Sequence, residues 1–231
     1  MAEFSGLVVF DNKTLKSELV ADWGFACVIW YGGKTMLFDT GANGTILIEN
    51  MKKLGVDPGE IEVVALSHAH WDHANGLGVL LESNNHVMVY LPESFPESYK
   101  SNVRHFGVAV KDIAEGGEIL EGVFTTGEMH GIIPEQALAF RTTKGTVIIT
   151  GCAHPGIVNI VQTAKEVAGT GIHLVLGGFH SPPESVVDRF IELGVQKVAP
   201  CHCSGAEAMK AFKESFGDNF VEVGVGKELT V

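Results

Sequence analysis

The sequence predicts an α/β protein of the four-layer αββα sandwich type, with two sheets face to face and helices outside. Paired strands feed helices in both halves of the chain, and hydrophobic residues make up 45% of it against 19% charged residues. No linker or low-complexity tract divides the 231 residues. A chain of this length and apolar content can bury a core of its own, so we expect a single domain over residues 1–231.

The N-terminal half predicts a hairpin followed by a helix. Residues 25–31 and 35–38 are apolar runs separated by Gly32-Gly33, a combination typical of a β-hairpin. Residues 43–54 carry apolar side chains at helical spacing, which predicts a helix packed on a sheet.

The next element sets up the first functional segment. Residues 61–66 are a short apolar run suited to a buried strand, so residues 67–73 are expected to form a loop at its end. The same alternation of strand, loop and helix returns later in the chain. The further elements expected are a helix from 77, a strand at 87–90, an irregular stretch around 92–96, strands at 136–142, 146–150, 172–176, 197–199 and 220–223, and helices at 157–167, 185–193 and 206–216.

The charge balance excludes two classes of partner. The chain has 16 Lys and Arg residues against 28 Asp and Glu, a net charge of −12, which repels nucleic acid and anionic membranes alike.

No apolar run reaches the ~18 residues of a membrane helix, and residues 1–10 lack the pattern of a signal peptide. Four cysteines are too few for a disulfide framework, so we expect a cytoplasmic protein.

The sharpest functional signal is the segment 67–73, Ser-His-Ala-His-Trp-Asp-His. It contains four potential metal ligands: His68, His70, Asp72 and His73. Imidazoles and a carboxylate can converge on a divalent ion where the backbone bends, and the end of a strand supplies that bend. His68 and His70 therefore suit one ion, and Asp72 and His73 suit a second.

This segment resembles the His-x-His-x-Asp-His signature of the metallo-β-lactamase-fold superfamily. Phe38-Asp-Thr-Gly41 is similar to the family's Asp-Thr-Gly element, and Pro200-Cys-His202 is similar to its last ligand strand. The resemblance implies two divalent metal ions, with zinc expected first and iron or manganese as alternatives. The ligands that it implies are His68 and His70 for the first ion, and Asp72, His73 and His202 for the second.

Two positions depart from the family's pattern. The third histidine of the first ion is assigned to His154, with His130 as the alternative because it lies closer to the usual position before a strand pair. Cys152 stands where many members carry a bridging Asp. Its thiolate can bind zinc, or its side chain packs as a small apolar group at the end of a strand. One or two bound ions are both compatible with this pattern.

Three residues are given roles other than metal binding, or in addition to it. Asp72 is predicted to hold the attacking nucleophile as well as to bind metal. His180, which follows two glycines, is predicted to contact the substrate or donate a proton, the alternative being that it orients a ligand. Asp39 is expected to hold a ligand histidine or the loop through hydrogen bonds rather than to touch the metal.

Further blocks of sequence resemble a narrower branch of the family, the 7,8-dihydropterin-6-methyl-4-(β-D-ribofuranosyl)-aminobenzene-5′-phosphate synthase-like proteins, which are associated with methanopterin-type biosynthesis. These blocks are residues 135–138, 150–159, 177–180 and 200–205. The resemblance to this branch adds a pterin transferase to the hydrolase function that is expected from the superfamily.

Three functions are in competition. The first is a hydrolase that uses a metal-activated hydroxide on an ester, lactone, amide or phosphoester. The second is a transferase that joins a dihydropterin pyrophosphate to a ribofuranosyl-aminobenzene phosphate, and the third is a non-catalytic metal-binding protein. The expected partner is a small-molecule substrate, with phosphorylated compounds among the candidates, and the sequence carries no signal for an oligomeric state.

Overall fold

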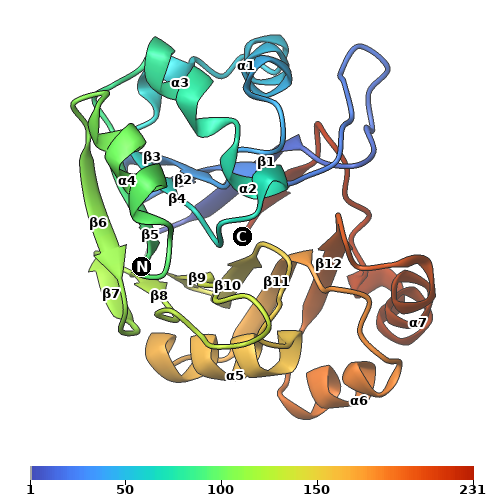
Figure 1. Cartoon of the computed structure of the whole chain (residues 1–231). Coiled ribbons are helices and arrows are strands. Elements are labelled where there is room, and N and C mark those ends of the chain that lie inside the picture. The colour runs from blue at the N-terminus through green and yellow to red at the C-terminus, as the bar shows by residue number, and fades with distance from the viewer. Residues whose placement is uncertain (1) are drawn as a thin grey trace. The chain divides into compact units, whose positions relative to one another are not determined.

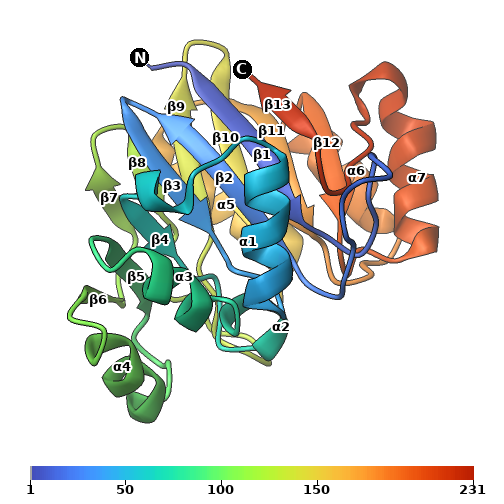
Figure 2. The same cartoon turned by 90° about the horizontal axis from the view of Figure 1, so that it is seen from above.

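The chain folds around two β-sheets that belong to two units, each with an apolar core of its own. The computed structural model describes residues 2–231. The first unit consists of Ser5–Ala114 and Gly224–Thr230, and the second of Glu115–Val223 with residues 2–4 and Val231. Figures 1 and 2 together label the α-helices and strands of both units.

The first unit contains a seven-stranded sheet with the order β13-β1-β2-β3-β4-β5-β6. β2 and β3 form the predicted hairpin, in which Gly32 and Gly33 adopt φ angles of 59° and 75° that glycine reaches without strain. From β3 to β6 the strands are parallel. The strands are β1 (Phe4–Phe10), β2 (Ala26–Tyr31), β3 (Lys34–Phe38), β4 (Val63–Ala65), β5 (Met88–Pro92), β6 (Ala109–Ile113) and β13 (Glu228–Thr230).

Helices of the first unit pack on this sheet through one apolar face. α1 (Gly44–Lys53) begins at Asn43, whose side chain accepts hydrogen bonds from the backbone N–H groups of Thr45 and Ile46. Its buried side chains Leu47 and Met51 join the core formed by the strands, and Figure 2 shows α1 lying over them. The other helices are η1 (Pro58–Glu60), α2 (Trp71–Ala74), α3 (Leu77–Ser83) and α4 (Glu97–Arg104).

The second unit contains a six-stranded sheet with the order β12-β11-β10-β9-β8-β7. β10, β11 and β12 are parallel, whereas the pairs from β7 to β10 are antiparallel. The strands are β7 (Gly117–Leu120), β8 (Val123–Thr125), β9 (Leu138–Thr142), β10 (Gly145–Thr150), β11 (Ile172–Gly178) and β12 (Lys197–Cys201).

An amphipathic helix, α5 (Ile157–Ala168), packs on strands β8, β9 and β10 (Figure 1). Its buried residues follow a helical period and belong to the core of the second unit. The rings of Phe179, Phe190 and Phe212 contact one another with centroids 5.1 to 5.6 Å apart, which joins two further helices to the end of β11. These helices are α6 (Ser185–Glu192) and α7 (Ala206–Phe216), and η2 (Gly217–Asn219) follows them.

The prediction of a terminal strand at 220–223 is wrong. Phe220 makes only an isolated bridge with Val198, and the last strand is β13, which pairs with β1. β13 escapes sequence reasoning because two of its three residues, Glu228 and Thr230, are polar and exposed. The irregular stretch expected around 92–96 leads directly into α4, whose sequence is too polar to show an apolar period.

The loops predicted to carry function follow parallel strands. Because parallel strands point in the same direction, the segments after β3 and β4 leave one edge of the first sheet. The segments after β10, β11 and β12 likewise leave one edge of the second sheet. Among the helices of residues 2–231, none combines the length and apolar content needed to cross a bilayer.

Candidate metal-binding segments

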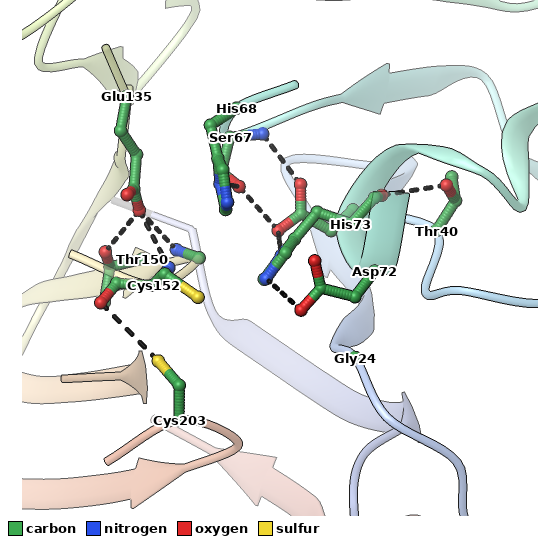
Figure 3. A network of polar contacts seen from close by, with 12 residues as sticks. Gly24, Thr40, Ser67, His68, Asp72, His73, Glu135, Thr150, Cys152 and Cys203 are labelled. Atoms are coloured by element: carbon green, nitrogen blue, oxygen red, sulfur yellow. Dashed lines mark hydrogen bonds and ion pairs between the residues drawn. The ribbon is translucent and has the colours of Figure 1, made fainter. Parts of the chain in front are cut away.

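Four predicted ligands lie together after β4 in the first unit. The chain turns at His70 into α2, where the backbone N–H of His73 donates to the carbonyl of His70 at 3.1 Å. This turn brings the ring of His68 to centroid distances of 4.7 Å from His70 and 4.3 Å from His73. Nε2 of His73 lies 3.7 Å from Oδ2 of Asp72. The motif therefore forms one compact group of nitrogen and oxygen donors, of which Figure 3 shows His68, Asp72 and His73.

A fully buried carboxylate, Asp39, holds this group in place. Its Oδ1 accepts a hydrogen bond from the backbone N–H of Ser67 at 2.7 Å, and its Oδ2 accepts from Ser67 Oγ at 2.8 Å. Nδ1 of His73 lies 2.7 Å from the same Oδ2, and Nδ1 of His68 lies 2.8 Å from Ser67 Oγ. The expectation that Asp39 makes hydrogen bonds to a histidine of this group and to the loop is confirmed, whereas metal binding by His73 stays a prediction.

The second unit contains a matching carboxylate that sequence reasoning missed. Glu135 has no exposed surface and precedes β9. Its Oε1 accepts hydrogen bonds from Thr150 Oγ1 and from the backbone N–H groups of Gly151, Cys152 and Ala153, at 3.2, 3.1, 2.9 and 2.9 Å. Hydrogen bonds from several donors stabilise a buried charge that would otherwise be costly. Glu135 therefore fixes the loop after β10, as Figure 3 shows.

The other oxygen of Glu135 orients His154. Oε2 lies 2.9 Å from both the backbone N and Nδ1 of His154. A carboxylate on Nδ1 makes Nε2 the nitrogen available to a metal or a substrate. The only sequence signal for this role was the presence of Glu135 in a block shared with the narrower branch.

The remaining predicted residues of the second unit lie on the neighbouring loops. The ring of His180, after β11, is exposed and lies 4.6 Å from that of His154, measured between centroids. His202 follows β12 and lies close enough to Cys203 to affect its ionisation. His130, the alternative ligand, is exposed on the loop between Met129 and Glu135.

Backbone strain gathers at these loops. Among residues 2–231, the non-glycine residues with positive φ are Asp39, Ala153, His180, Ser181 and His202, with values from 46° to 65°. Each such residue costs on the order of 1–3 kcal/mol and persists only where its surroundings enforce it. All five follow strands β3, β10, β11 or β12, so the strain coincides with the segments that carry the predicted ligands.

Two cysteines lie on the same loops as these histidines. Sγ of Cys203 lies 3.6 Å from the carbonyl oxygen of Cys152. The residue Cys152 is buried, with 4% of its surface exposed. A hydrogen bond with the Cys152 side chain lowers the pKa of the Cys203 thiol to about 6, against the opposing effect of burial, and His202 adds to the lowering. By contrast, burial raises the pKa of Cys27 to about 12. None of the four cysteines forms a disulfide.

A cavity of about 310 Å³ opens beside His154 and His180 in the second unit. The first turn of α5 and the segment Ser181–Pro183 form its walls, with apolar contributions from Ile157 and Phe179. This combination of an apolar wall and two imidazoles is typical of a site for a small organic molecule.

Comparisons with known proteins agree with the family resemblance of the His-x-His-x-Asp-His motif. The family model of the Metallo-beta-lactamase superfamily matches residues 24–202. The chain is 29% identical to the 7,8-dihydropterin-6-methyl-4-(beta-D-ribofuranosyl)-aminobenzene-5'-phosphate synthase of Methanocaldococcus jannaschii, over 84% of this chain and 83% of that protein. The resemblance inferred from the sequence is confirmed.

Solved structures confirm the fold class. The crystal structure of a metal-dependent hydrolase of the beta-lactamase superfamily matches 99% of both chains with a TM-score of 0.81 and 28% identity. A metallo-beta-lactamase fold protein from Bacillus subtilis matches the whole of both chains with a TM-score of 0.75 at 13% identity, which is a likeness of fold alone.

Proposed function

The chain belongs to the metallo-beta-lactamase superfamily, and on that premise we propose that it is a metal-dependent hydrolase of a small-molecule ester, lactone, amide or phosphoester. The similarity to a metal-dependent hydrolase of the beta-lactamase superfamily at 28% identity supports this proposal. The proposed cofactor is a pair of divalent ions, zinc first. The proposed ligands are His68, His70, Asp72 and His73 in the first unit and His154 and His202 in the second.

The observation that carries the proposal is the pair of carboxylates behind two of these histidines. Asp39 lies 2.7 Å from Nδ1 of His73, and Glu135 lies 2.9 Å from Nδ1 of His154. Metal-binding histidines characteristically donate the other ring N–H to a carboxylate, which fixes the ring and makes the ligand nitrogen more basic. The residues present therefore fit a divalent metal of the zinc, iron or manganese type.

Bound divalent ions would lower the pKa of water from ~16 to roughly 7 and polarise the oxygen under attack. Asp72 would orient the attacking water through its carboxylate. His180, exposed beside His154, would contact the substrate and donate a proton to the leaving group. The cavity next to these two histidines would hold the organic part of the substrate.

The similarity to the Methanocaldococcus jannaschii synthase favours a second function, that of a transferase. In this reaction an aromatic amine-bearing ribosyl phosphate attacks the methylene of a dihydropterin pyrophosphate, and pyrophosphate leaves. His180 would then contact the phosphorylated substrate. The two functions use the same proposed ligands and differ in the nucleophile, which is water in one case and the aromatic partner in the other.

Metal analysis of the purified protein tests the proposal. We expect at least one equivalent of zinc, iron or manganese, and a loss of metal without unfolding in His70→Ala. The matched control is His86→Ala, which removes an exposed histidine of the same unit and should retain the metal. Less than half an equivalent in the wild-type protein, or full retention in His70→Ala, would contradict the proposal.

Pyrophosphate release separates the two functions. Release from a dihydropterin pyrophosphate only in the presence of the aromatic amine partner would establish the transferase. Hydrolysis of model esters, lactones, amides or phosphoesters, with no such dependence, would establish the hydrolase. Bound metal with neither activity would favour a non-catalytic metal-binding protein.

A further inference from the structure

Three side chains with metal-binding atoms meet on the loops after β10, β11 and β12 of the second unit. The sulfur atoms of Cys152 and Cys203 and a ring nitrogen of His180 all lie within 4.8 Å of one another. His180 and Cys203 lie outside the ligand set proposed above, and Cys152 stands where many family members carry the bridging Asp. We propose that His180 and Cys203 join Cys152 in a binding site for a soft, thiol-seeking cation such as zinc, cadmium or copper(I).

Glycine at the end of β11 creates the space for this cluster. A Cβ atom added at Gly178 would lie 2.6 Å from Sγ of Cys203 and 3.3 Å from Cα of Cys152. β11 lies between β10 and β12 in the sheet, so a side chain here would separate the two cysteines. The neighbouring Gly177 is equally constrained, because its Cβ would lie 2.0 Å from the carbonyl oxygen of Thr150. The absence of side chains at 177–178 therefore lets Cys203 approach Cys152.

The donor set determines which cations fit. Two thiolates and an imidazole suit zinc and other soft ions, whereas magnesium and calcium prefer oxygen ligands. Zinc binds sulfur at about 2.3 Å and nitrogen at about 2.0 Å, so tetrahedral donors lie about 3.5–3.8 Å apart. Donors within 4.8 Å reach this geometry through movements on the order of 1 Å. Rotation of the Cys203 side chain, which now contacts the carbonyl of Cys152, supplies part of that movement.

The cluster is accessible from solvent. Cys152 is buried, Cys203 is half-buried and His180 is exposed, so a cation can approach from the side of His180. Three protein ligands leave a fourth position for water or a small molecule, as in open zinc sites.

A cation at this site would have a consequence for the reaction, and this step rests on the proposed function. His180 is the residue proposed to contact the substrate, and coordination of its ring would withdraw it from that role. Soft cations would then inhibit the enzyme.

Titration of the metal-free, full-length protein with Co²⁺ tests the site directly. Thiolate ligands give cobalt a strong charge-transfer absorption in the near ultraviolet, which nitrogen and oxygen ligands do not give. We expect this absorption in the wild-type protein, its decrease in Cys203→Ala, and its retention in Cys27→Ala, where the thiol lies elsewhere. An unchanged absorption in Cys203→Ala, or none in the wild type, would overturn the proposal.

Two further measurements keep the outcomes separate. His70→Ala should retain the charge-transfer absorption, because it removes a proposed catalytic ligand and no sulfur, so failure of the catalytic proposal does not affect this test. Cd²⁺ binding by calorimetry should weaken at least tenfold in Cys203→Ser, the variant that best preserves the side-chain volume. Equal Cd²⁺ affinity in wild type and Cys203→Ser, with both proteins folded by circular dichroism, would also reject the site.

Discussion

Oε2 of Glu135 lies 2.9 Å from Nδ1 of His154, and the other oxygen of the same carboxylate accepts hydrogen bonds from three successive backbone N–H groups. One buried side chain therefore fixes both the loop after β10 and the orientation of the imidazole on it. Asp39 does the same in the first unit, where it binds Ser67 and His73. Each unit thus prepares its histidines through a carboxylate that lies outside the proposed ligand set.

Substitution of Glu135 by Gln should weaken metal binding more than it perturbs the fold. The neutral amide keeps one oxygen, which can accept hydrogen bonds from the backbone N–H groups of the loop. It has no second oxygen that could accept from His154 Nδ1 at the same time. We expect a 10–100-fold loss of metal affinity, typical of removing a partner of a ligand histidine, and a loss of stability of about 1.5–3 kcal/mol. Calorimetric titration with Zn²⁺ and urea unfolding measure the two effects.

The control for this variant is Glu121→Gln, which changes an exposed carboxylate of the same unit. It should leave both the metal affinity and the stability within error of the wild type. Nitrogen-15 NMR of the metal-free protein provides a second readout, because the Nδ1-protonated tautomer of His154 should decrease in Glu135→Gln. An unaltered tautomer together with unaltered affinity would show that Glu135 is only structural.

Asp39→Asn should have a larger effect on stability. Asp39 is fully buried and accepts hydrogen bonds from the Ser67 backbone and hydroxyl as well as contacting His73. An amide nitrogen in place of Oδ2 would face donors, leaving buried groups unsatisfied at about 1–3 kcal/mol each. We expect a decrease of about 2–4 kcal/mol in the free energy of unfolding by urea, while the exposed Asp218→Asn should change it little. A decrease below ~0.5 kcal/mol would contradict this account.

The places of the segments that carry the proposed ligands could be predicted because each segment follows a local apolar strand and contains residue types with few other uses. The group His68, His70, Asp72 and His73 follows β4, and Asp39 follows β3. Their position in the sequence just after a recognisable strand was sufficient to predict where they lie. The role of Asp39 was predictable for the same reason: a short acid directly after a buried strand has few partners other than the neighbouring loop.

Glu135 and the edge strands were not predictable in the same way. Glu135 acts on residues 150–154, and a contact between separate segments leaves no trace in local periodicity. β6 carries polar, exposed residues such as Lys111 and Asp112, and therefore lacks the apolar run that marks a buried strand. The polar sequence of α4 hides that helix in the same way.

The thiols of Cys203 and Cys27 should differ sharply in reactivity. The pKa of Cys203 is lowered to about 6 and that of Cys27 is raised to about 12. Because the thiolate is the nucleophile, alkylation of Cys203 by iodoacetamide should rise with pH and level off above about pH 7, while Cys27 stays unmodified at pH 8. Peptide mass spectrometry of the chelator-treated protein measures both sites. A rate at Cys203 that keeps rising to pH 9 would contradict the lowered pKa.

Replacement of Ala153 by Gly tests the strain in the loop after β10. Ala153 has a φ of 65°, a left-handed conformation that costs an L-residue with a Cβ roughly 1–2 kcal/mol. Glycine removes this cost but adds flexibility to the unfolded chain and loses a buried methyl, so we expect a change in unfolding free energy between 0 and about +1 kcal/mol. Ala164→Gly, in the middle of α5, is the matched control and should lose about 1 kcal/mol or more. If both variants lose equal stability in urea unfolding, the conformation at Ala153 is not strained.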